Sequence, residues 1–205
     1  MIEGVHIWRA ALDDPGWPPA AELPAPERKR AAAFLHEGAA RRWAASRWAL
    51  RRVLAEYIGE AAASVELEIG ERGKPRLPAG AGPEFSLSHS GGLALVAVCD
   101  RPLGIDVEAI RPRRNLVALA ARALGADEAA AVRAASPAER PAVFHAAWVR
   151  REARLKCLGT GLGATPATTP VRVEDLDVAP GYAAALAVAG TRPAGLPCHS
   201  LEAGC

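Results

Sequence analysis

Two stretches of the chain carry side chains whose types and spacing could serve one reaction. Gly-Ile-Asp-Val-Glu contains Asp106 and Glu108, and Trp-Val-Arg-Arg-Glu-Ala-Arg-Leu-Lys contains Glu152 and Lys156. In a strand, Asp106 and Glu108 project from the same face, because successive side chains alternate. In a helix, Glu152 and Lys156 stand four residues apart and share a face. If the strand and the helix meet, these carboxylates can hold a hard cation beside a phosphate group.

Each part of this pattern also has an ordinary structural interpretation. Asp106 and Glu108 fit exposed positions of a strand. Glu152 and Lys156 fit an i,i+4 surface ion pair, which stabilises a helix by about a few tenths of a kcal/mol. His89 fits a hydrogen-bonded residue of a Ser-His-Ser turn. Only the combination of motifs favours a shared site over these separate interpretations.

Several segments carry apolar residues at helical spacing. They are residues 26–36, 39–58, 115–135, and a last segment that starts at residue 136 or 141 and ends near 158. Gly59 and the Gly159-Thr160-Gly161 run are expected to end two of these helices. A break near Gly125 is expected inside the third, with Asp127 capping a fresh helix.

Other segments have the alternation or the short apolar run of a β-strand. They are residues 4–9, 65–69, 84–88, 93–99, 103–108, 171–173 and 182–188. The strands between 84 and 108 are expected to form one antiparallel sheet, with turns at 89–92 and 100–102. The tail from Thr191 is expected to be irregular. Each half reads as a helix plus a small sheet, so the pattern predicts an α+β fold and allows two similar lobes joined near residue 100.

The composition is globular and nearly neutral. The chain has 205 residues, half of them apolar, and a net charge of +2. That size suits one domain or two joined halves, and the low charge disfavours a general nucleic-acid binder. No basic leader followed by an apolar stretch is visible, and no apolar run is long enough to span a bilayer. We therefore expect a soluble cytoplasmic protein without membrane partners.

The cysteines give no zinc or disulfide signature. None of the four is spaced as Cys-x-x-Cys or partnered by histidine at zinc-ligand spacing. Cys99 falls in an apolar run and is expected to be a buried thiol. No role is assigned to Cys198 or Cys205.

Basic residues gather in one segment of the first half. Between Glu27 and Tyr57, eight arginines and lysines stand against three acids. Such a local excess can focus an anionic ligand. Five of the arginines flank the apolar stripe of the 39–58 helix, at positions 41, 42, 47, 51 and 52. Most of them fit a solvated basic face, whereas Arg42, near the start of the helix, is the one we favour for a phosphate contact.

Taken in order, the motifs resemble those of one family. The chain presents Gly-Lys-Pro at Lys74, Phe-Ser-Leu-Ser-His-Ser-Gly-Gly around His89, Gly-Ile-Asp-Val-Glu, and finally Trp-x-x-x-Glu-Ala-x-x-Lys-x-x-Gly-x-Gly-Leu. This order and spacing resembles the 4'-phosphopantetheinyl transferase superfamily, specifically the longer Sfp-type enzymes. The motifs span residues 73–162, and the basic segment 26–52 also resembles the amino-terminal half of that family.

The resemblance implies a fold and an activity. The fold would be two similar α+β lobes related by a pseudo-twofold axis, residues 1–100 and residues 101–205, with the metal site on the second lobe and coenzyme A between them. The activity would be Mg²⁺-dependent transfer of 4'-phosphopantetheine from coenzyme A to a serine of an apo acyl or peptidyl carrier protein, releasing adenosine 3',5'-bisphosphate. Because one chain would build the whole site, we expect a monomer.

The resemblance also implies roles for individual residues. Asp106, Glu108 and Glu152 would be the Mg²⁺ ligands. Lys156 would hold the pyrophosphate. Glu152 is in addition our candidate for the base that takes the proton of the carrier serine. Arg151 stands where the family often has lysine, so it keeps the charge, but its direct role is less defined.

Contacts with coenzyme A are implied for residues of the first half. His89, with Ser88 beside it, would contact the 3'-phosphate. Lys74 and its turn would lie against the adenine nucleotide. Arg42 would reach the phosphates, and the motif match does not separate the individual roles of Arg28, Lys29 and Arg30.

Two other classes of function stay open at this point. One is a non-catalytic coenzyme A or nucleotide-binding protein of the same fold, and the other is an anion- or nucleic-acid-binding module built on residues 28–52. Mg²⁺-dependent consumption of coenzyme A distinguishes the transferase from both. The carrier is not identified by the sequence: fatty-acid, polyketide and non-ribosomal peptide carriers all fit, and the basic face at 41–52 is a candidate dock for an acidic carrier.

Overall fold

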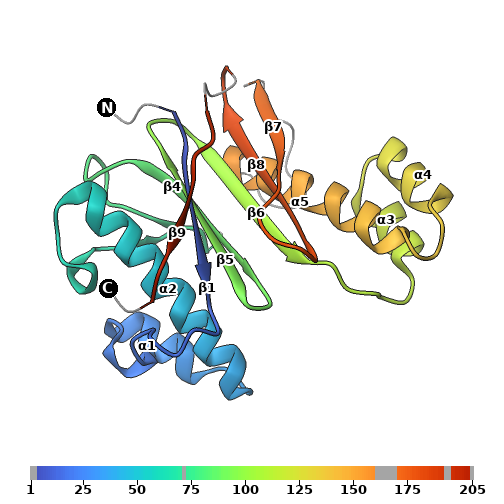
Figure 1. The fold of residues 1–205 in the computed structure, drawn as a ribbon. Coiled ribbons are helices and arrows are strands. Elements are labelled where there is room, and N and C mark those ends of the chain that lie inside the picture. The colour runs from blue at the N-terminus through green and yellow to red at the C-terminus, as the bar shows by residue number, and fades with distance from the viewer. Residues whose placement is uncertain (1–3, 71–72, 160–169, 192–194, 204–205) are drawn as a thin grey trace. The chain divides into compact units, whose positions relative to one another are not determined.

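The computed structural model describes residues 4–70, 73–159, 170–191 and 195–203 (Figure 1). Its α-helices are α1 (Ala25–Ala32), α2 (Glu37–Ile58), α3 (Leu116–Ala123), α4 (Ala126–Ala134) and α5 (Arg140–Leu158). Its strands are β1 (His6–Ala11), β2 (Glu68–Ile69), β3 (Pro75–Arg76), β4 (Glu84–Ser90), β5 (Leu93–Cys99), β6 (Leu103–Ala109), β7 (Val171–Leu176), β8 (Tyr182–Ala189) and β9 (Cys198–Leu201). The predicted α+β class is confirmed.

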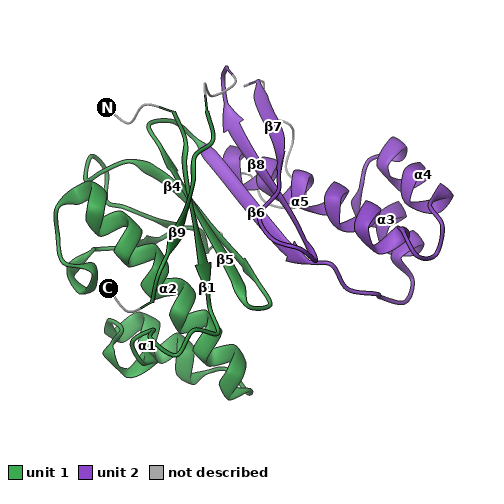
Figure 2. Ribbon diagram, in the orientation of Figure 1, with its two compact units in different colours: residues 1–102, 193–205 green, residues 103–192 purple. Residues whose placement is uncertain are grey.

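The chain divides into two compact units, which Figure 2 colours separately. Unit 1 contains residues 1–102 and 193–205, and unit 2 contains residues 103–192. The end of the chain therefore belongs to the same unit as its beginning. The assignment of residues 1–100 and 101–205 as two family lobes related by a pseudo-twofold axis stays a prediction.

Unit 1 is built on a four-stranded sheet in the order β4-β5-β1-β9. All residues of β5 are buried, as expected of its continuous apolar run. Helix α2 packs its apolar stripe onto this sheet, so that Leu50, Val53 and Leu54 share a core with Phe85 and Val96. The helix ends where predicted, at Gly59, whose φ of 74° suits a residue without a Cβ.

The tail is more ordered than its composition suggested. The prediction of an irregular tail is wrong for residues Cys198–Leu201, which form β9 and pair in parallel with β1. Arg52 of α2 also donates to the carbonyl oxygens of Glu202 and Ala203, both at 2.8 Å. A parallel pairing between opposite ends of the chain leaves no local turn signal, which is why the sequence did not indicate it.

Unit 2 contains a three-stranded antiparallel sheet in the order β6-β8-β7, covered by α5. The prediction that residues 103–108 continue the sheet of residues 84–99 is wrong, because β6 pairs with β8 in this second sheet. Sequence proximity favours pairing of consecutive strands. Here the small-residue run of β8 provides the partner instead.

The helices of unit 2 follow the predicted boundaries with one correction. The break at Gly125 is confirmed, but Gly125 itself is the residue that precedes α4, and Asp127 lies in the first turn and does not cap it. Helix α5 starts at Arg140, just after a turn in which Ser136 Oγ donates to Glu139 Oε2 at 2.6 Å. Gly159 ends α5 with a φ of 64°, and residues 160 and 161 lie outside the described residues.

No helix in the described part of the chain is both long and apolar enough to span a bilayer.

Candidate functional site

Close packing of α5 against β6 sets the geometry of the acidic motif. Gly104, Asp106 and Glu108 alternate onto one face of β6, and β8 places alanines opposite all three. Gly104 sits directly under α5: a Cβ at this position would overlap the carbonyl oxygen of Ala153 and approach the Cβ of Lys156 to 2.7 Å. The missing side chain therefore lets the helix lie close enough for its polar residues to reach the strand.

Lys156 and Asp106 meet where the helix crosses the strand. Lys156 Nζ donates to Asp106 Oδ1 at 2.7 Å and to the carbonyl oxygen of Ile105 at 3.0 Å. The Asp106 side chain is 7% exposed and that of Lys156 29% exposed. The carboxylate thus lies inside the unit, while the Lys156 side chain is partly exposed to solvent. Lys156 thus contacts the strand, and its charge also acts on Glu152, four residues earlier on the helix.

The charges of Asp106 and Lys156 also act on Glu152. Its side chain is 20% exposed. Burial raises the pKa of the Glu152 carboxyl above its ordinary value, and the negative charges of Asp106 and Glu108 raise it further. The cations of Lys156 and Arg151 act in the opposite direction. A carboxylate with a raised pKa is a stronger proton acceptor, so this position suits a general base.

The donor chemistry of this acidic cluster suits a hard divalent cation. Asp106, Glu108 and Glu152 offer only oxygen ligands, and their mutual repulsion would be relieved by a bound cation. Within the described ranges, however, no three His, Cys, Asp or Glu side chains are grouped so that they could hold a metal ion as they stand. In this arrangement the ammonium of Lys156 supplies the positive charge beside Asp106.

The other predicted site residues belong to unit 1. Ser88 and His89 are neighbours on β4, with Ser88 buried and His89 exposed. Lys74 is half-buried and follows Gly73, whose φ of 78° makes the turn into β3. They lie on the elements that the motifs indicated, and the roles assigned to them stay predictions.

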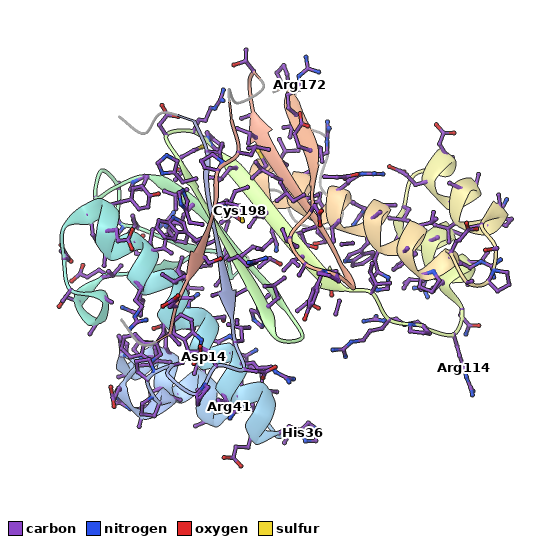
Figure 3. All side chains as sticks on the ribbon, viewed as in Figure 1. Asp14, His36, Arg41, Arg114, Arg172 and Cys198 are labelled. Atoms are coloured by element: carbon purple, nitrogen blue, oxygen red, sulfur yellow. The ribbon has the colours of Figure 1, made fainter. Side chains whose placement is uncertain are left out.

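Arg42 has a partner that the sequence did not indicate. Its guanidinium group donates to both carboxylate oxygens of Asp13, from Nε at 2.7 Å and from Nη2 at 3.1 Å. Arg41 lies 3.8 Å from the same carboxylate. Figure 3 labels Arg41 and His36, which both belong to the start of α2. A phosphate contact by Arg42 would therefore have to compete with Asp13 or be oriented by it.

Two arginines of α2 contradict the prediction of a solvated basic face. Arg47 and Arg51 are buried and both donate to the buried carboxylate of Glu27, at 2.5 and 2.6 Å from their Nε atoms. Their i,i+4 spacing placed them on one face of the helix, but the sequence offered no signal that Glu27 would be opposite that face.

Known proteins resemble this chain over the region that contains the acidic cluster. A family model described as the 4'-phosphopantetheinyl transferase superfamily matches residues 102–193. The chain is also 36% identical to the 4'-phosphopantetheinyl transferase HetI of Nostoc sp., over 93% of this chain and 90% of that protein. The chain belongs to the 4'-phosphopantetheinyl transferase superfamily. The family identification made from the motifs is confirmed.

Further members of the superfamily resemble parts of the chain. A 4'-phosphopantetheinyl transferase of Bacillus subtilis is 29% identical over 76% of this chain and 68% of its own length. The transferase AcpT of Salmonella typhimurium is 38% identical over 57% of this chain and 58% of its own length. The superfamily match spans all of unit 2, and therefore the whole Asp106–Lys156 region.

Proposed function

We propose that this protein transfers 4'-phosphopantetheine from coenzyme A to a serine hydroxyl of an apo acyl or peptidyl carrier protein, with release of adenosine 3',5'-bisphosphate. The observation that carries the proposal is the cluster of Asp106, Glu152 and Lys156 formed by β6 and α5, inside the region matched by the superfamily. The relatives described above are named as transferases, so they lend no support to the non-catalytic alternative.

The acidic cluster is proposed to hold Mg²⁺ through Asp106, Glu108 and Glu152. When bound, this ion polarises the attacked phosphate and neutralises charge on the leaving bisphosphate. The support is the all-oxygen donor set and the raised pKa of Glu152, which is due first to burial and then to repulsion by Asp106 and Glu108. Lys156 would have to share or exchange its contact with Asp106 when the pyrophosphate of coenzyme A arrives. A flexible ammonium group can do so more easily than a planar guanidinium.

Residues of α5 are proposed to handle the proton and the phosphate charge. The serine oxygen forms a bond to phosphorus while the bond to the bisphosphate breaks, and the serine proton passes to Glu152. The raised pKa of the Glu152 carboxyl favours that acceptance. Lys156 and the neighbouring Arg151, which lies 3.4 Å from Glu152, would stabilise the pyrophosphate oxygens.

Unit 1 is proposed to recognise the nucleotide part of coenzyme A. His89 and Ser88 would contact the 3'-phosphate, Lys74 the adenine nucleotide, and Arg42 the phosphates. The exposure of His89 on β4 is compatible with a ligand contact. If this is right, His89→Ala raises the KM for coenzyme A about 10-fold with little change in kcat, because the 3'-phosphate does not react. Equal use of coenzyme A and dephospho-coenzyme A by the unaltered protein would contradict this role.

Intact-mass spectrometry tests the proposed reaction. Apo carrier proteins from fatty-acid, polyketide and non-ribosomal peptide systems are incubated separately with the protein, coenzyme A and Mg²⁺, and matched samples receive EDTA. A mass gain equal to one phosphopantetheine, abolished by EDTA, is the expected result. A gain that persists in EDTA would overturn the metal requirement. Binding of coenzyme A without a mass gain on a carrier protein of any class would overturn the proposed transfer.

Other predictions accompany this proposal. We expect a cytoplasmic, monomeric enzyme of the Sfp type that uses carrier proteins of secondary or fatty-acid metabolism. Size-exclusion chromatography with light scattering tests the oligomeric state, and the carrier panel described above identifies the preferred carrier class.

A further inference from the structure

A pocket lies within unit 1, beside α1, α2 and the segment that leads into β2. Its volume is about 360 Å³, within the usual range of small-molecule sites. Most of its wall is apolar, and Arg47, Arg51 and Glu27 provide its buried charges. The apolar wall comes from Pro24, Pro26, Ala63, Val65, Leu67, Ile69 and Pro78. We call this site the Arg47 pocket.

The buried charges of the Arg47 pocket do not balance. Glu27 accepts one hydrogen bond from each of two arginines, so a single carboxylate compensates two cations. Arg51 is satisfied further, because its Nη1 atom donates to the carbonyl oxygens of Ala62 at 3.2 Å and Val65 at 2.8 Å. Arg47 therefore has fewer protein acceptors than Arg51.

Arg47 lines the pocket and is held by Glu27 through one of its three guanidinium nitrogens. Its side chain is 7% exposed, and its Nε atom is held by Glu27. Within the described residues, neither of its outer nitrogens, Nη1 and Nη2, has a protein acceptor; the nearest aromatic group is Trp43, whose ring centroid is 5.8 Å from the guanidinium carbon. Burial lowers the pKa of the Arg47 guanidinium, because removing a charged group from water carries a cost. An acceptor that reaches these nitrogens would offset that cost.

The acidic residues of the pocket limit the charge of such an acceptor. Glu66 and Glu68 are exposed, and Glu68 is paired with Arg76 at 2.8 Å. A polyphosphate would meet repulsion from Glu66 and from Glu27 beyond what one free guanidinium edge offsets. A single carboxylate, by contrast, can accept two parallel hydrogen bonds from that edge.

We propose that the Arg47 pocket binds a small organic carboxylate with an apolar tail. The carboxylate accepts from Nη1 and Nη2 of Arg47, whose orientation is fixed by Glu27. The tail packs on Leu67 and Ile69, and it covers the Ile69 side chain, which is 63% exposed without a ligand. None of the residues that line this pocket is assigned to the phosphopantetheine chemistry, so the proposal does not depend on it.

Isothermal titration calorimetry with octanoate tests the proposal. Octanoate is expected to bind saturably and about 10-fold or more tightly than two reference ligands. The first, 1-octanol, lacks the negative charge, and the second, pyrophosphate, carries more negative charge than the pocket can compensate. The variant Arg47→Gln should remove this preference for the carboxylate. Amide chemical shifts of residues 63–69 should move with octanoate and identify the site.

A surface variant keeps the test decisive if Arg47→Gln does not fold. Ile69→Ser removes an exposed apolar contact and should weaken octanoate binding about 3- to 5-fold. Leu35→Ser is the matched control, because Leu35 is 96% exposed and lies outside the pocket. Equal affinity for octanoate and octanol, or equal loss in Ile69→Ser and Leu35→Ser, would overturn the proposal. Absence of saturable binding would overturn it as well and would leave water as the partner of Arg47.

Discussion

Two clusters of buried charges, one in each unit, differ in how completely they are enclosed. In unit 1, the side chains of Glu27, Arg47 and Arg51 are 10%, 7% and 4% exposed. In unit 2, Asp106 is equally buried, but its partner Lys156 is 29% exposed. The first cluster is enclosed by protein except where Arg47 lines its pocket, whereas the second combines a buried carboxylate with a partly exposed lysine.

The type of cation fits each environment. A guanidinium group is planar and presents several donors in fixed directions. One glutamate can therefore accept a hydrogen bond from each of two arginines and fix the orientation of both. An ammonium group is a compact charge on a flexible stem and can exchange partners. The enclosed cluster of unit 1 is therefore suited to stabilise the fold, and the half-open cluster of unit 2 is suited to chemistry. The Arg47 pocket is the one place where the enclosed cluster would also take a ligand.

The largest effect is expected from breaking the half-open cluster. Asp106→Asn removes a carboxylate but keeps its size, and we expect carrier modification to fall about 10³-fold. The measurement is the initial rate of phosphopantetheine transfer followed by intact mass. Asp127→Asn, on the exposed first turn of α4, is the control and should leave the rate unchanged. A rate above one tenth of the original, with Mg²⁺ saturating, would contradict the role of Asp106.

Breaking the enclosed cluster should instead affect stability. Glu27→Gln leaves Arg47 and Arg51 without a compensating charge, and we expect a loss of about 3 kcal/mol in the free energy of unfolding. Urea denaturation measures this loss. Glu22→Gln, at an exposed position just before α1, is the matched control. A loss no larger than that of the control would show that the enclosed cluster contributes little to stability.

Shifting the helix that carries the half-open cluster should affect both properties. Gly104→Ala places a Cβ against Ala153 of α5, and we expect about 2 kcal/mol of destabilisation together with reduced transfer activity. Gly38→Ala provides the contrast, since a Cβ there would meet nothing within 4 Å outside the neighbouring backbone of α2, and alanine is favoured in a helix. Thermal unfolding compares the two variants. Equal melting temperatures would mean that the close approach of α5 to β6 is not required.

The smallest effect is expected at the solvent-exposed ion pair of Arg42 and Asp13. The hydrogen bond from Arg42 holds the pKa of the Asp13 carboxyl below its ordinary value of 3.8. Because this folded-state pKa is lowered, the pair stabilises the fold above the unfolded pKa, and the contribution disappears as pH falls through the folded pKa. Arg42→Ala should raise the Asp13 pKa towards 3.8, as measured by NMR titration, and should change stability by no more than a few tenths of a kcal/mol. An unchanged Asp13 pKa would contradict the pairing.

Local patterns in the sequence were sufficient for most of the elements that position the site. Helical periodicity with a terminal glycine predicted α2 and the end of α5, because both signals act within a few residues. Alternation in residues 103–108 predicted that Asp106 shares a face with Glu108. The order of the motifs also indicated the family, since each motif is a short run of specific residue types.

Contacts between distant segments were decided by the tertiary structure alone. The pairing of β9 with β1, of β6 with β8, and of Glu27 with two arginines of α2 each join residues that no local pattern connects. The contact of Lys156 with Asp106, 50 positions apart, is of the same kind. A sequence determines which side chains can form a strand, a helix or an ion pair. Which partners they meet depends on the packing of the whole unit, because burial and hydrogen bonding are satisfied collectively and not residue by residue.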